Sequence, residues 1–376
     1  MSRILLVVDV PWAFVMNRLS LAEHARAQGF DVHIASGVGG GEEPIIARGF
    51  PYHPLRLSRK GRNPLFEAWN VLELTSLYRR LRPDVVHHVT LKPILYGSLA
   101  ARLAGVPAVV NAFAGLGYAF TVSGTPAVAV TRTLLSAALA AAVPRQRTIN
   151  VFENPDDRAV MVQAGVCTPE NARVLPGVGI DVDAFRPSPE PLGRVRVTLA
   201  GRMLREKGVM EFVAAARMLR GEGIDLEFVL AGAADPANPG SLSEAELSEL
   251  HDQGDVRWLG FQKDMASLLS GSHVVCLPSY YREGIPRALL EGAACGRPLV
   301  ATDVPGCREI VRDGVNGLLV KARDAEGLAN AVRSLARDPE TRRRFGAAGR
   351  RIVEQEFALP IVLRKMTGIY AEVLAA

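Results

Sequence analysis

Cysteine is scarce in this chain and follows no metal-binding or disulfide pattern. The 376 residues include four cysteines, and no two of them form a Cys-x-x-Cys pair. They are Cys167, Cys276, Cys295 and Cys307. Neither a zinc site nor a disulfide framework is therefore indicated. Isolated, reduced thiols are typical of a cytoplasmic protein.

Long hydrophobic runs are also missing. The longest apolar stretch, residues 133–143, has roughly half the length that a membrane-spanning helix needs. The run over residues 1–15 is interrupted by Asp9 and is followed by no small-residue cleavage site, so we do not expect a signal peptide. We expect a buried strand at residues 4–8 and no transmembrane helix.

Acidic residues are absent from one long segment. No Asp or Glu occurs in residues 85–152, although Lys92 and several arginines lie there. Residues 1–180 carry a formal charge of +6, whereas residues 181–376 carry −1. This asymmetry suits an anionic partner such as a membrane surface, a lipid phosphate or a nucleic acid. The alternative is a buried apolar sheet domain that lacks acids for no functional reason.

The basic composition, with a pI of about 9.2, also raises the hypothesis of a nucleic-acid-binding protein. However, the basic run 56–62 contains no aromatic residue, and platforms for single-stranded nucleic acid need aromatic side chains between their cations. We therefore expect no nucleic acid partner. Salt-sensitive nucleic-acid binding without any UDP-sugar binding would favour that hypothesis instead.

Both halves of the chain alternate short β-branched runs with helical patterns. In the first half we expect strands at residues 4–8, 31–35, 85–88 and 108–111, and helices such as 18–28 and 96–104. In the second half we expect strands at 195–200, 227–231, 256–258, 274–277 and 299–301, and helices at 209–220, 288–294 and 325–336. This alternation predicts an α/β fold with parallel sheets covered by helices on both faces.

The length favours two domains rather than one. We expect an N-terminal Rossmann-like domain at residues 1–180 and a second at residues 194–355, joined by a proline-containing linker at 181–193. A helix over residues 356–376 would cross back to the first domain. Because such doubly wound sheets bind ligands beyond the carboxyl ends of their strands, we expect the two domains to face one another across a cleft.

Two glutamates flank a predicted helix start in the second half. Glu283 lies in the loop that follows the expected strand 274–277. Pro286 suits the first helical position, because its missing N–H costs nothing there. Glu291 then falls roughly a turn and a half inside the helix.

The backbone between these glutamates is suited to bind phosphate. N–H groups near Gly284, Ile285 and Arg287 would form a positively polarised helix end. A loop carboxylate, an anion-binding helix end and a helical carboxylate match the sugar, the diphosphate and the ribose of a nucleotide-sugar. The alternative is an ordinary capped surface helix with two solvated acids.

A second candidate phosphate site follows the first strand of the second half. The loop from Gly201 to Gly208 contains Arg202, which can bind oxygens bidentately, and Lys207, which acts as a point charge. Gly232 follows the next strand. Such a loop is common by chance, but these residues and the glutamate pair all lie at strand carboxyl ends, where this architecture binds ligands.

At this point the chain resembles the retaining glycosyltransferases of family 4, which have the GT-B fold. The resemblance covers nearly the full length and is strongest in the second half. It rests on three motifs: Gly201-Arg202…Lys207-Gly208; Pro278-Ser279…Glu283-Gly284-Ile285-Pro286…Glu291-Gly292; and Gly306-Cys307-Arg308-Glu309-Ile310-Val311…Gly314-Val315-Asn316-Gly317-Leu318-Leu319-Val320.

The resemblance implies a role for each donor-site residue. Arg202 and Lys207 would hold the donor diphosphate, Glu283 would position the donor sugar as the catalytic carboxylate, and Glu291 would bind the ribose. The remaining donor contacts would come from Gly232, Gly284, Ile285 and Pro286. The reaction would proceed by front-face attack with retention of anomeric configuration, without a covalent intermediate, a cofactor or a metal.

In the first half, two segments resemble the subgroup that extends sugars on undecaprenyl diphosphate. One contains His88 and Lys92, and the other contains the Gly115–Gly117 turn. The resemblance implies that His88 takes part in catalysis and that Lys92, Gly115 and Gly117 bind the lipid-linked acceptor. A structural role for His88 is the alternative.

The loop after the first strand departs from the family pattern. Many members have a Gly-Gly pair there, whereas this chain has residues 9–18 without glycine. Backbone approach to the donor at this loop is therefore in doubt. We assign Asn17 and Arg18 to acceptor binding instead.

The sequence Asp181-Val182-Asp183 fits the Asp-x-Asp motif of metal-dependent transferases. It lies beside the expected linker and away from any expected strand end, so we expect no metal site.

The favoured interpretation is a cytoplasmic enzyme bound peripherally to the inner membrane. It would use a UDP-sugar, such as a UDP-N-acetylhexosamine, and a polyprenyl-diphosphate-linked acceptor. An isomerase of the same fold, similar to UDP-N-acetylglucosamine 2-epimerase, is the alternative.

Overall fold

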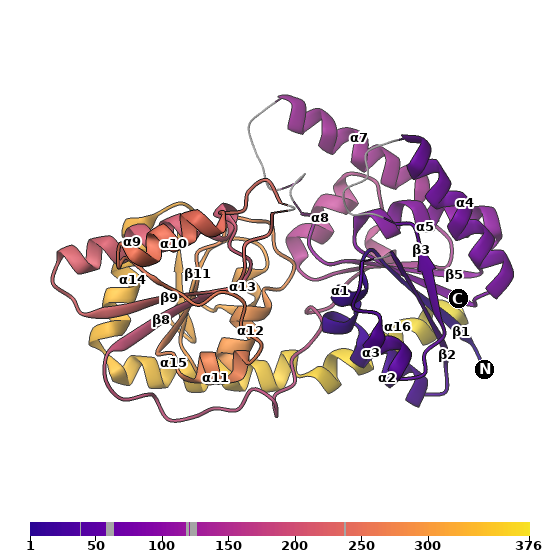
Figure 1. Cartoon of the computed structure of the whole chain (residues 1–376). Helices are drawn as coiled ribbons and strands as arrows, with labels where there is room; N and C mark the ends of the chain where they lie inside the picture. Colours follow the sequence, from indigo (N-terminus) through magenta and orange to yellow (C-terminus); the bar gives the residue numbers. More distant parts are fainter. Residues whose placement is uncertain (38, 58–63, 118–119, 121–125, 237) are drawn as a thin grey trace. The chain divides into compact units, whose positions relative to one another are not determined.

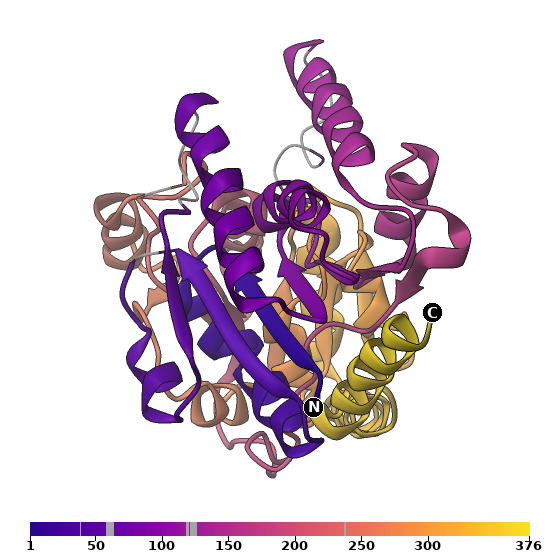
Figure 2. The same cartoon turned by 90° about the vertical axis from the view of Figure 1, so that its right-hand side faces the viewer.

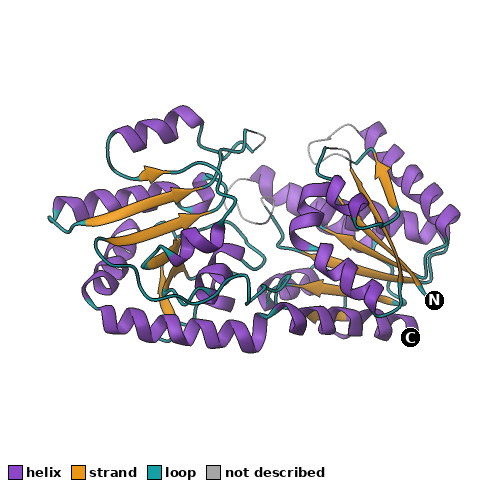
Figure 3. Cartoon of the chain, turned by 60° about the horizontal axis from the view of Figure 1, so that its bottom comes forward, coloured by secondary structure: helices purple, strands orange, loops and turns teal. Residues whose placement is uncertain are grey.

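The structure is a computed structural model that describes residues 1–376 except 38, 58–63, 118–119, 121–125 and 237. The chain forms two compact units, of which unit 1 comprises residues 1–178 and 360–376 and unit 2 comprises residues 179–359 (Figure 1). In each unit, helices flank both sides of a parallel sheet (Figure 3). The predicted α/β fold with two doubly wound Rossmann-like domains is confirmed.

The units end at places that differ from the predicted domain boundaries. Residues 181–193, which we expected to be a linker, belong to unit 2. They are tied to it by Arg297, whose Nη2 donates to the carbonyl oxygens of Ser188 at 3.1 Å and Pro189 at 3.2 Å. The C-terminal helix α16 (Leu359–Ala375) belongs to unit 1 from residue 360 onward.

Among the described residues, the sheet of unit 1 has seven strands in the order β3-β2-β1-β4-β5-β6-β7, all parallel. The strands are β1 (Arg3–Val8), β2 (Asp31–Gly37), β3 (Tyr52–Leu55), β4 (Val85–Val89), β5 (Ala108–Phe113), β6 (Thr148–Phe152) and β7 (Ala172–Val174). The helices are α1 (Pro11–Asn17), α2 (Leu19–Ala27), α3 (Glu43–Ala47), α4 (Pro64–Leu81), α5 (Leu91–Ala104), α7 (Pro126–Ala142), α8 (Pro155–Gln163) and the short 3₁₀ turn η1 (Pro169–Asn171). Gly105 ends α5 in the left-handed conformation, as expected of a C-cap.

In the described part of unit 2, six parallel strands follow the order β10-β9-β8-β11-β12-β13. They are β8 (Val195–Ala200), β9 (Leu226–Ala231), β10 (Arg257–Trp258), β11 (Val274–Leu277), β12 (Leu299–Thr302) and β13 (Gly317–Val320). The helices are η2 (Arg205–Lys207), α9 (Val209–Gly221), α10 (Glu244–Asp252), α11 (Met265–Ser270), α12 (Arg287–Ala294), α13 (Cys307–Ile310), α14 (Ala325–Arg337), α15 (Pro339–Ile352) and η3 (Val353–Phe357). None of the described helices of the chain is long and apolar enough to cross a membrane.

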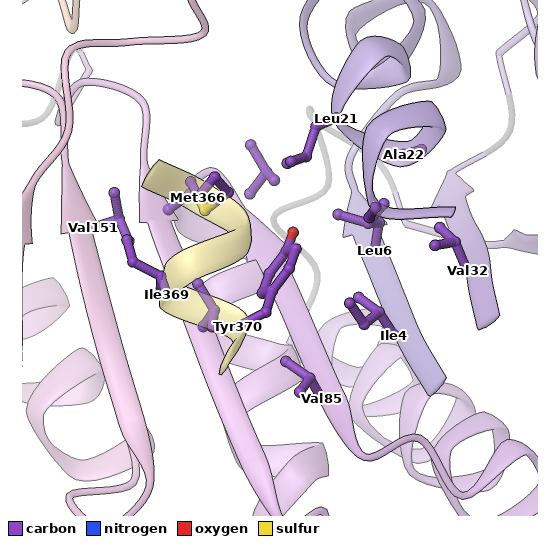
Figure 4. Packing of buried hydrophobic residues seen from close by; sticks show 14 of the residues in the cluster. Ile4, Leu6, Leu21, Ala22, Val32, Val85, Val151, Met366, Ile369 and Tyr370 are labelled. Carbon is purple, nitrogen blue, oxygen red and sulfur yellow. The ribbon is translucent and has the colours of Figure 1, made fainter. Parts of the chain in front are cut away.

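The C-terminal helix α16 is part of the core of unit 1. Its buried residues Met366, Ile369 and Tyr370 lie in one hydrophobic cluster with Val85 of β4 and Val151 of β6 (Figure 4). Because full burial of one such side chain contributes about 1.5–3 kcal/mol, these contacts hold the last helix on the sheet.

Candidate active site

The strands of unit 2 bring the predicted donor residues to one edge of the sheet. Gly201 follows β8, Gly232 follows β9 and Pro278 follows β11, and the order β9-β8-β11 makes these strands neighbours. The loops are joined by backbone hydrogen bonds, such as Tyr280 N to Glu206 O at 2.9 Å. The prediction that these segments meet at the carboxyl ends of the strands is therefore confirmed.

Two glycines permit a close approach of these loops. A Cβ atom at Gly208 would lie 2.1 Å from the carbonyl oxygen of Pro278, and Gly208 has a φ of +79°. A Cβ atom at Gly232 would lie 1.7 Å from the carbonyl oxygen of Gly201. Since contacts below 3 Å are not tolerated, only glycine fits at both positions without moving the backbone.

Lys207 and Glu283 form an ion pair at this edge. The Lys207 Nζ donates to Glu283 Oε1, and the Ser279 hydroxyl donates to the same oxygen at 3.2 Å. Their side chains are only 13% and 12% exposed. The ion pair therefore fixes an ammonium group and a carboxylate side by side at the strand ends. The electrostatic interaction between two charges is stronger at such a partly buried site than in bulk water.

Arg202 supplies a second cation on the same loop. Its Nη1 donates to Asp235 Oδ2 at 3.0 Å, while 38% of its side chain is exposed. A guanidinium group has five N–H donors, so one bond to Asp235 leaves others for a phosphate. Asp235 orients the guanidinium group.

The loop from Glu283 to Pro286 leads into helix α12. Pro286 is the N-cap residue, with a φ of −67° and a ψ of 113°, and the helix begins at Arg287. We expected Pro286 at the first helical position, but it lies one residue before the helix, so this part of the prediction is wrong. Gly284 lies against Gly306, where a Cβ atom would be 2.0 Å from the Gly284 carbonyl oxygen, and Ile285 packs against the adjoining hydrophobic cluster.

Glu291 lies in the second turn of α12 and is buried, with 6% of the residue exposed. Burial raises the pKa of its carboxyl group, and the nearby Arg287 guanidinium opposes this rise. Arg287 Nη2 donates to Glu291 Oε1 at 3.1 Å. A buried carboxylate oriented by an arginine suits the binding of a ribose diol through hydrogen bonds.

In unit 1 the structure gives His88 a structural role in place of the predicted catalytic one. His88 lies within β4, and its side chain is completely buried. Its Nδ1 donates to Asn111 Oδ1 at 2.9 Å, and its Nε2 accepts from the Tyr78 hydroxyl at 3.0 Å. Burial lowers its pKa to about 4. A Cβ atom at Gly97 would lie 2.3 Å from Nε2, so helix α5 closes off the ring.

The predicted acceptor residues Lys92, Gly115 and Gly117 follow two neighbouring strands, β4 and β5, so the structure brings their segments to one edge. The ends of these strands are joined by a hydrogen bond from Thr90 N to Ala112 O at 3.2 Å. Lys92 lies in the first turn of α5, and its Nζ donates to Glu67 Oε1 at 2.8 Å. Gly115 and Gly117 have φ angles of +79° and +69°, which residues other than glycine rarely adopt.

Asn17 and Arg18 lie where α1 meets α2. The Asn17 side chain donates to the carbonyl oxygen of Ala13 at 3.0 Å. Arg18 is buried, with 5% exposed, and its Nη2 lies 3.8 Å from Glu153 Oε1. Burial lowers the pKa of Arg18. Arg18 therefore lies inside unit 1, next to the end of β6, rather than on its surface.

Sequence reasoning missed the polar partners Asp235, Glu153 and Tyr370, and it named Ser279 in a motif without giving it a role. Asp235 lies three residues beyond the singled-out Gly232, and Ser279 lies four residues before Glu283. Their positions just after strands were a usable signal. The bond between Tyr370 OH and His87 Nδ1, at 2.6 Å, joins residues 283 positions apart and has no local signal.

The two aspartates of the Asp-x-Asp motif form a local turn. Asp181 Oδ1 accepts from the backbone N–H groups of Asp183, at 2.9 Å, and Ala184, at 3.1 Å. This is the ordinary use of an aspartate in an Asx turn.

Two family models match separate parts of the chain. The model described as "Glycosyl transferases group 1" matches residues 183–352, and "Glycosyl transferase 4-like" matches residues 3–144.

Three curated relatives cover most of the chain. The N,N'-diacetylbacillosaminyl-diphospho-undecaprenol alpha-1,3-N-acetylgalactosaminyltransferase of Campylobacter jejuni is 28% identical over 76% of this chain and 76% of its own length. The alpha-maltose-1-phosphate synthase of Mycolicibacterium smegmatis is 33% identical over 77% of this chain and 79% of its own length. The UDP-Gal:alpha-D-GlcNAc-diphosphoundecaprenol alpha-1,3-galactosyltransferase of Escherichia coli is 27% identical over 69% of this chain and 68% of its own length.

Among solved structures, Anabaena Alr3699/HepE in complex with UDP and glucose superposes with a TM-score of 0.79. The match covers 99% of this chain and 100% of that chain at 18% identity, which supports the fold alone. Taken with the family models and the relative at 33% identity, the fold and the edge of unit 2 show that this chain belongs to the family 4 glycosyltransferases of the GT-B fold.

Proposed function

We propose that this enzyme transfers a sugar, with retention of configuration and without a metal, from a UDP-sugar to a polyprenyl-diphosphate-linked acceptor. The observation that carries the proposal is the cluster of Arg202, Lys207 and Glu283 at one edge of unit 2. Two cations on a glycine-flanked loop suit a diphosphate, and a carboxylate beside them suits sugar hydroxyls.

The donor would lie along the strand ends of unit 2. Arg202 and Lys207 would bind the two phosphates, Glu283 would orient the sugar, and Glu291 would accept hydrogen bonds from the ribose hydroxyls. Gly232 and the loop of Gly284, Ile285 and Pro286 would line the path of the diphosphate.

In the transfer step, the acceptor hydroxyl oxygen bonds to the anomeric carbon while the bond from that carbon to the β-phosphate oxygen breaks. The hydroxyl proton passes to the departing diphosphate, and no covalent enzyme intermediate forms. Negative charge develops on the leaving UDP, and Lys207 and Arg202 are already in place to stabilise it. These two cations supply the positive charge, so we expect no requirement for a divalent ion.

The acceptor would bind to unit 1 near Lys92, Gly115 and Gly117. The names of the Campylobacter and Escherichia coli relatives state undecaprenol-linked diphosphates as acceptors, and they support a lipid-linked acceptor here. They also support an N-acetylhexosamine or a hexose as the transferred sugar and UDP as the nucleotide. Such acceptors would place the enzyme at the cytoplasmic face of the inner membrane.

The test measures UDP release by the purified protein from a panel of UDP-sugars, with and without an undecaprenyl-diphosphate-linked sugar. We expect release that depends on the lipid acceptor and continues in EDTA. The product's anomeric configuration, determined by NMR, should match that of the donor. A changed UDP-sugar formed without acceptor would indicate an isomerase instead. Loss of activity in EDTA would contradict the metal-independent mechanism.

A further inference from the structure

Unit 1 has a pocket at the outer edge of its sheet that the proposed transfer reaction does not use. The pocket has a volume of about 560 Å³ and lies between the edge strand β3 and helix α4. Strands β2 and β1 separate β3 from β4 and β5, whose ends carry the predicted acceptor residues. None of the residues that line the pocket is a predicted acceptor residue, so a ligand here would contact other side chains than the acceptor sugar does.

Helix α4 presents a mixed stripe of side chains to this pocket. Trp69, Leu72, Ser76 and Arg80 recur at helical spacing and line it together. Trp69 is 52% exposed and Leu72 is 60% exposed, and both line the pocket together with charged side chains. Tryptophan with this surrounding is typical of the boundary between water and lipid, because its ring is apolar and its N–H is polar.

The charges around the pocket are mostly positive. Arg56 and Arg80 line it and carry the positive charge. His53 of β3 also lines it, but burial, together with His33 and Arg80, lowers the pKa of its imidazole, so this ring adds no charge near pH 7. Glu73 is the acid at the pocket, and its Oε2 already accepts the backbone N–H of Arg56 at 2.9 Å. Within the described residues, neither guanidinium group has an ion-pair partner, so both can bind an anion.

A second helix of unit 1 also exposes apolar side chains. Val130 and Leu134 of α7 are 57% and 65% exposed and lie one turn apart. Helix α5 packs against both α4 and α7. Figures 1 and 2 show α4 and α7 projecting on the same side of unit 1. This side is where unit 1 could meet an apolar phase.

We propose that the β3–α4 pocket binds the headgroup of an anionic phospholipid in a bilayer. Arg56 and Arg80 would contact the phosphate, and Trp69 and Leu72 would enter the boundary between headgroups and acyl chains. A soluble phosphate would leave the two apolar side chains exposed to water, so a lipid fits better. A nucleic acid fits less well, because successive bases stack on several aromatic side chains and this pocket has one tryptophan. The inference rests on the proposed function only in that a lipid-linked acceptor brings the enzyme to a membrane.

The test is co-sedimentation of the full chain with vesicles of phosphatidylcholine alone or with phosphatidylglycerol, in the absence of any nucleotide-sugar or acceptor. We expect binding only with phosphatidylglycerol and weaker binding as salt rises. The double variant Arg56→Glu/Arg80→Glu should bind at least about tenfold more weakly. Trp69→Ser/Leu72→Ser should also weaken binding, but with the salt dependence kept.

A charge-matched control reverses two exposed arginines of unit 2, in the variant Arg337→Glu/Arg351→Glu. It should bind vesicles as the wild type does, and all variants should keep the melting temperature of the wild type. Equal binding by the wild type and the pocket variants, or equal loss in the control, would overturn the inference. So would wild-type binding to RNA that the pocket variants lose while no vesicle binds. Because the assay contains no sugar donor, its outcome is independent of whether the proposed transfer reaction is correct.

Discussion

The two units have the same architecture, but they place their polar side chains differently. In unit 2, Lys207 and Glu283 lie in loops just beyond the strands and form an ion pair at the edge of the sheet. In unit 1, His88 and Asn111 lie within β4 and β5 and are buried. Side chains within a strand point to one of the helix layers, whereas side chains beyond its end can point to a ligand. The position of a side chain relative to the end of its strand thus separates a structural role from a chemical one.

The largest expected effect comes from Glu283→Gln in unit 2. Removing the charge that positions the donor sugar should slow transfer by at least about a hundredfold, as for other fixed polar groups that act in the transition state. The melting temperature should fall only modestly, because the amide keeps the size of the side chain and can still accept hydrogen bonds, although the ion pair with Lys207 is lost. Initial rates of UDP release check this. Glu326→Gln, on the exposed first turn of α14, is the matched control, and an unchanged rate for Glu283→Gln would refute the assignment of the site.

Lys207→Ala should weaken UDP binding by about thirtyfold, because hydrogen bonds to charged groups contribute about 1.5–3 kcal/mol. Transfer should slow as well, since the same ammonium stabilises the leaving diphosphate. Isothermal titration calorimetry with UDP measures the affinity. The comparison is Lys365→Ala on the exposed side of α16, which should bind UDP normally. Similar affinities for both variants would show that the loop of unit 2 does not hold the diphosphate.

The buried histidines of unit 1 should make its stability depend on pH. Burial lowers the pKa of His88 to about 4 in the folded chain, whereas its ordinary pKa is 6.5. Between these two pH values the imidazole is protonated in the unfolded chain and neutral in the folded chain, so protonation favours unfolding. The stability of unit 1 should therefore fall as the pH drops, by about 2 kcal/mol between pH 7 and pH 5. His87, whose pKa burial and Arg18 also lower, acts in the same direction.

Hydrogen exchange of β4 peptides at the two pH values measures this effect. In His88→Asn, which titrates no proton there, the loss of protection should be smaller than in the wild type. If wild-type protection does not change with pH, His88 is not the buried neutral group that the structure shows.

The smallest expected effect is that of Tyr370→Phe. The variant removes the hydroxyl partner of His87 Nδ1 and should destabilise unit 1 by about 1 kcal/mol. Urea unfolding followed by hydrogen exchange measures this loss. Binding of UDP should be unchanged, since its predicted contacts all lie in unit 2. A loss of UDP affinity in this variant would show that UDP binding depends on unit 1 as well as on unit 2.

Strong local patterns predicted most of the strands. The β-branched runs of β1, β8 and β11 were found within one residue of their ends, because buried parallel strands are continuous apolar runs. Strands β3, β6, β7 and β13 were missed. β3 contains Pro54 and lies at the sheet edge, and β7 has only three residues. Such short or interrupted strands form because a neighbour offers hydrogen bonds, which no local pattern records.

The candidate donor residues could be named because their glycines, cations and acids all follow strands of one predicted sheet, where this architecture binds ligands. Glu283, Arg202 and Lys207 were found in this way. The catalytic role of His88 came from the family resemblance, and the burial of its side chain within β4 favours the structural alternative. Asp235 and Tyr370 escaped, because their importance comes from a partner far along the chain, Arg202 or His87.

The sequence by itself determined the α/β class, the division into two Rossmann-like parts and the motifs that place the chain in its family. These depend on periodicity and on glycines at fixed positions, which act locally. The tertiary structure decided which side chains meet: the ion pair of Lys207 with Glu283, the burial of His88, and the docking of α16 on unit 1. Those contacts join segments many residues apart, so they exist only after the parallel sheets have brought the strand ends to a common edge.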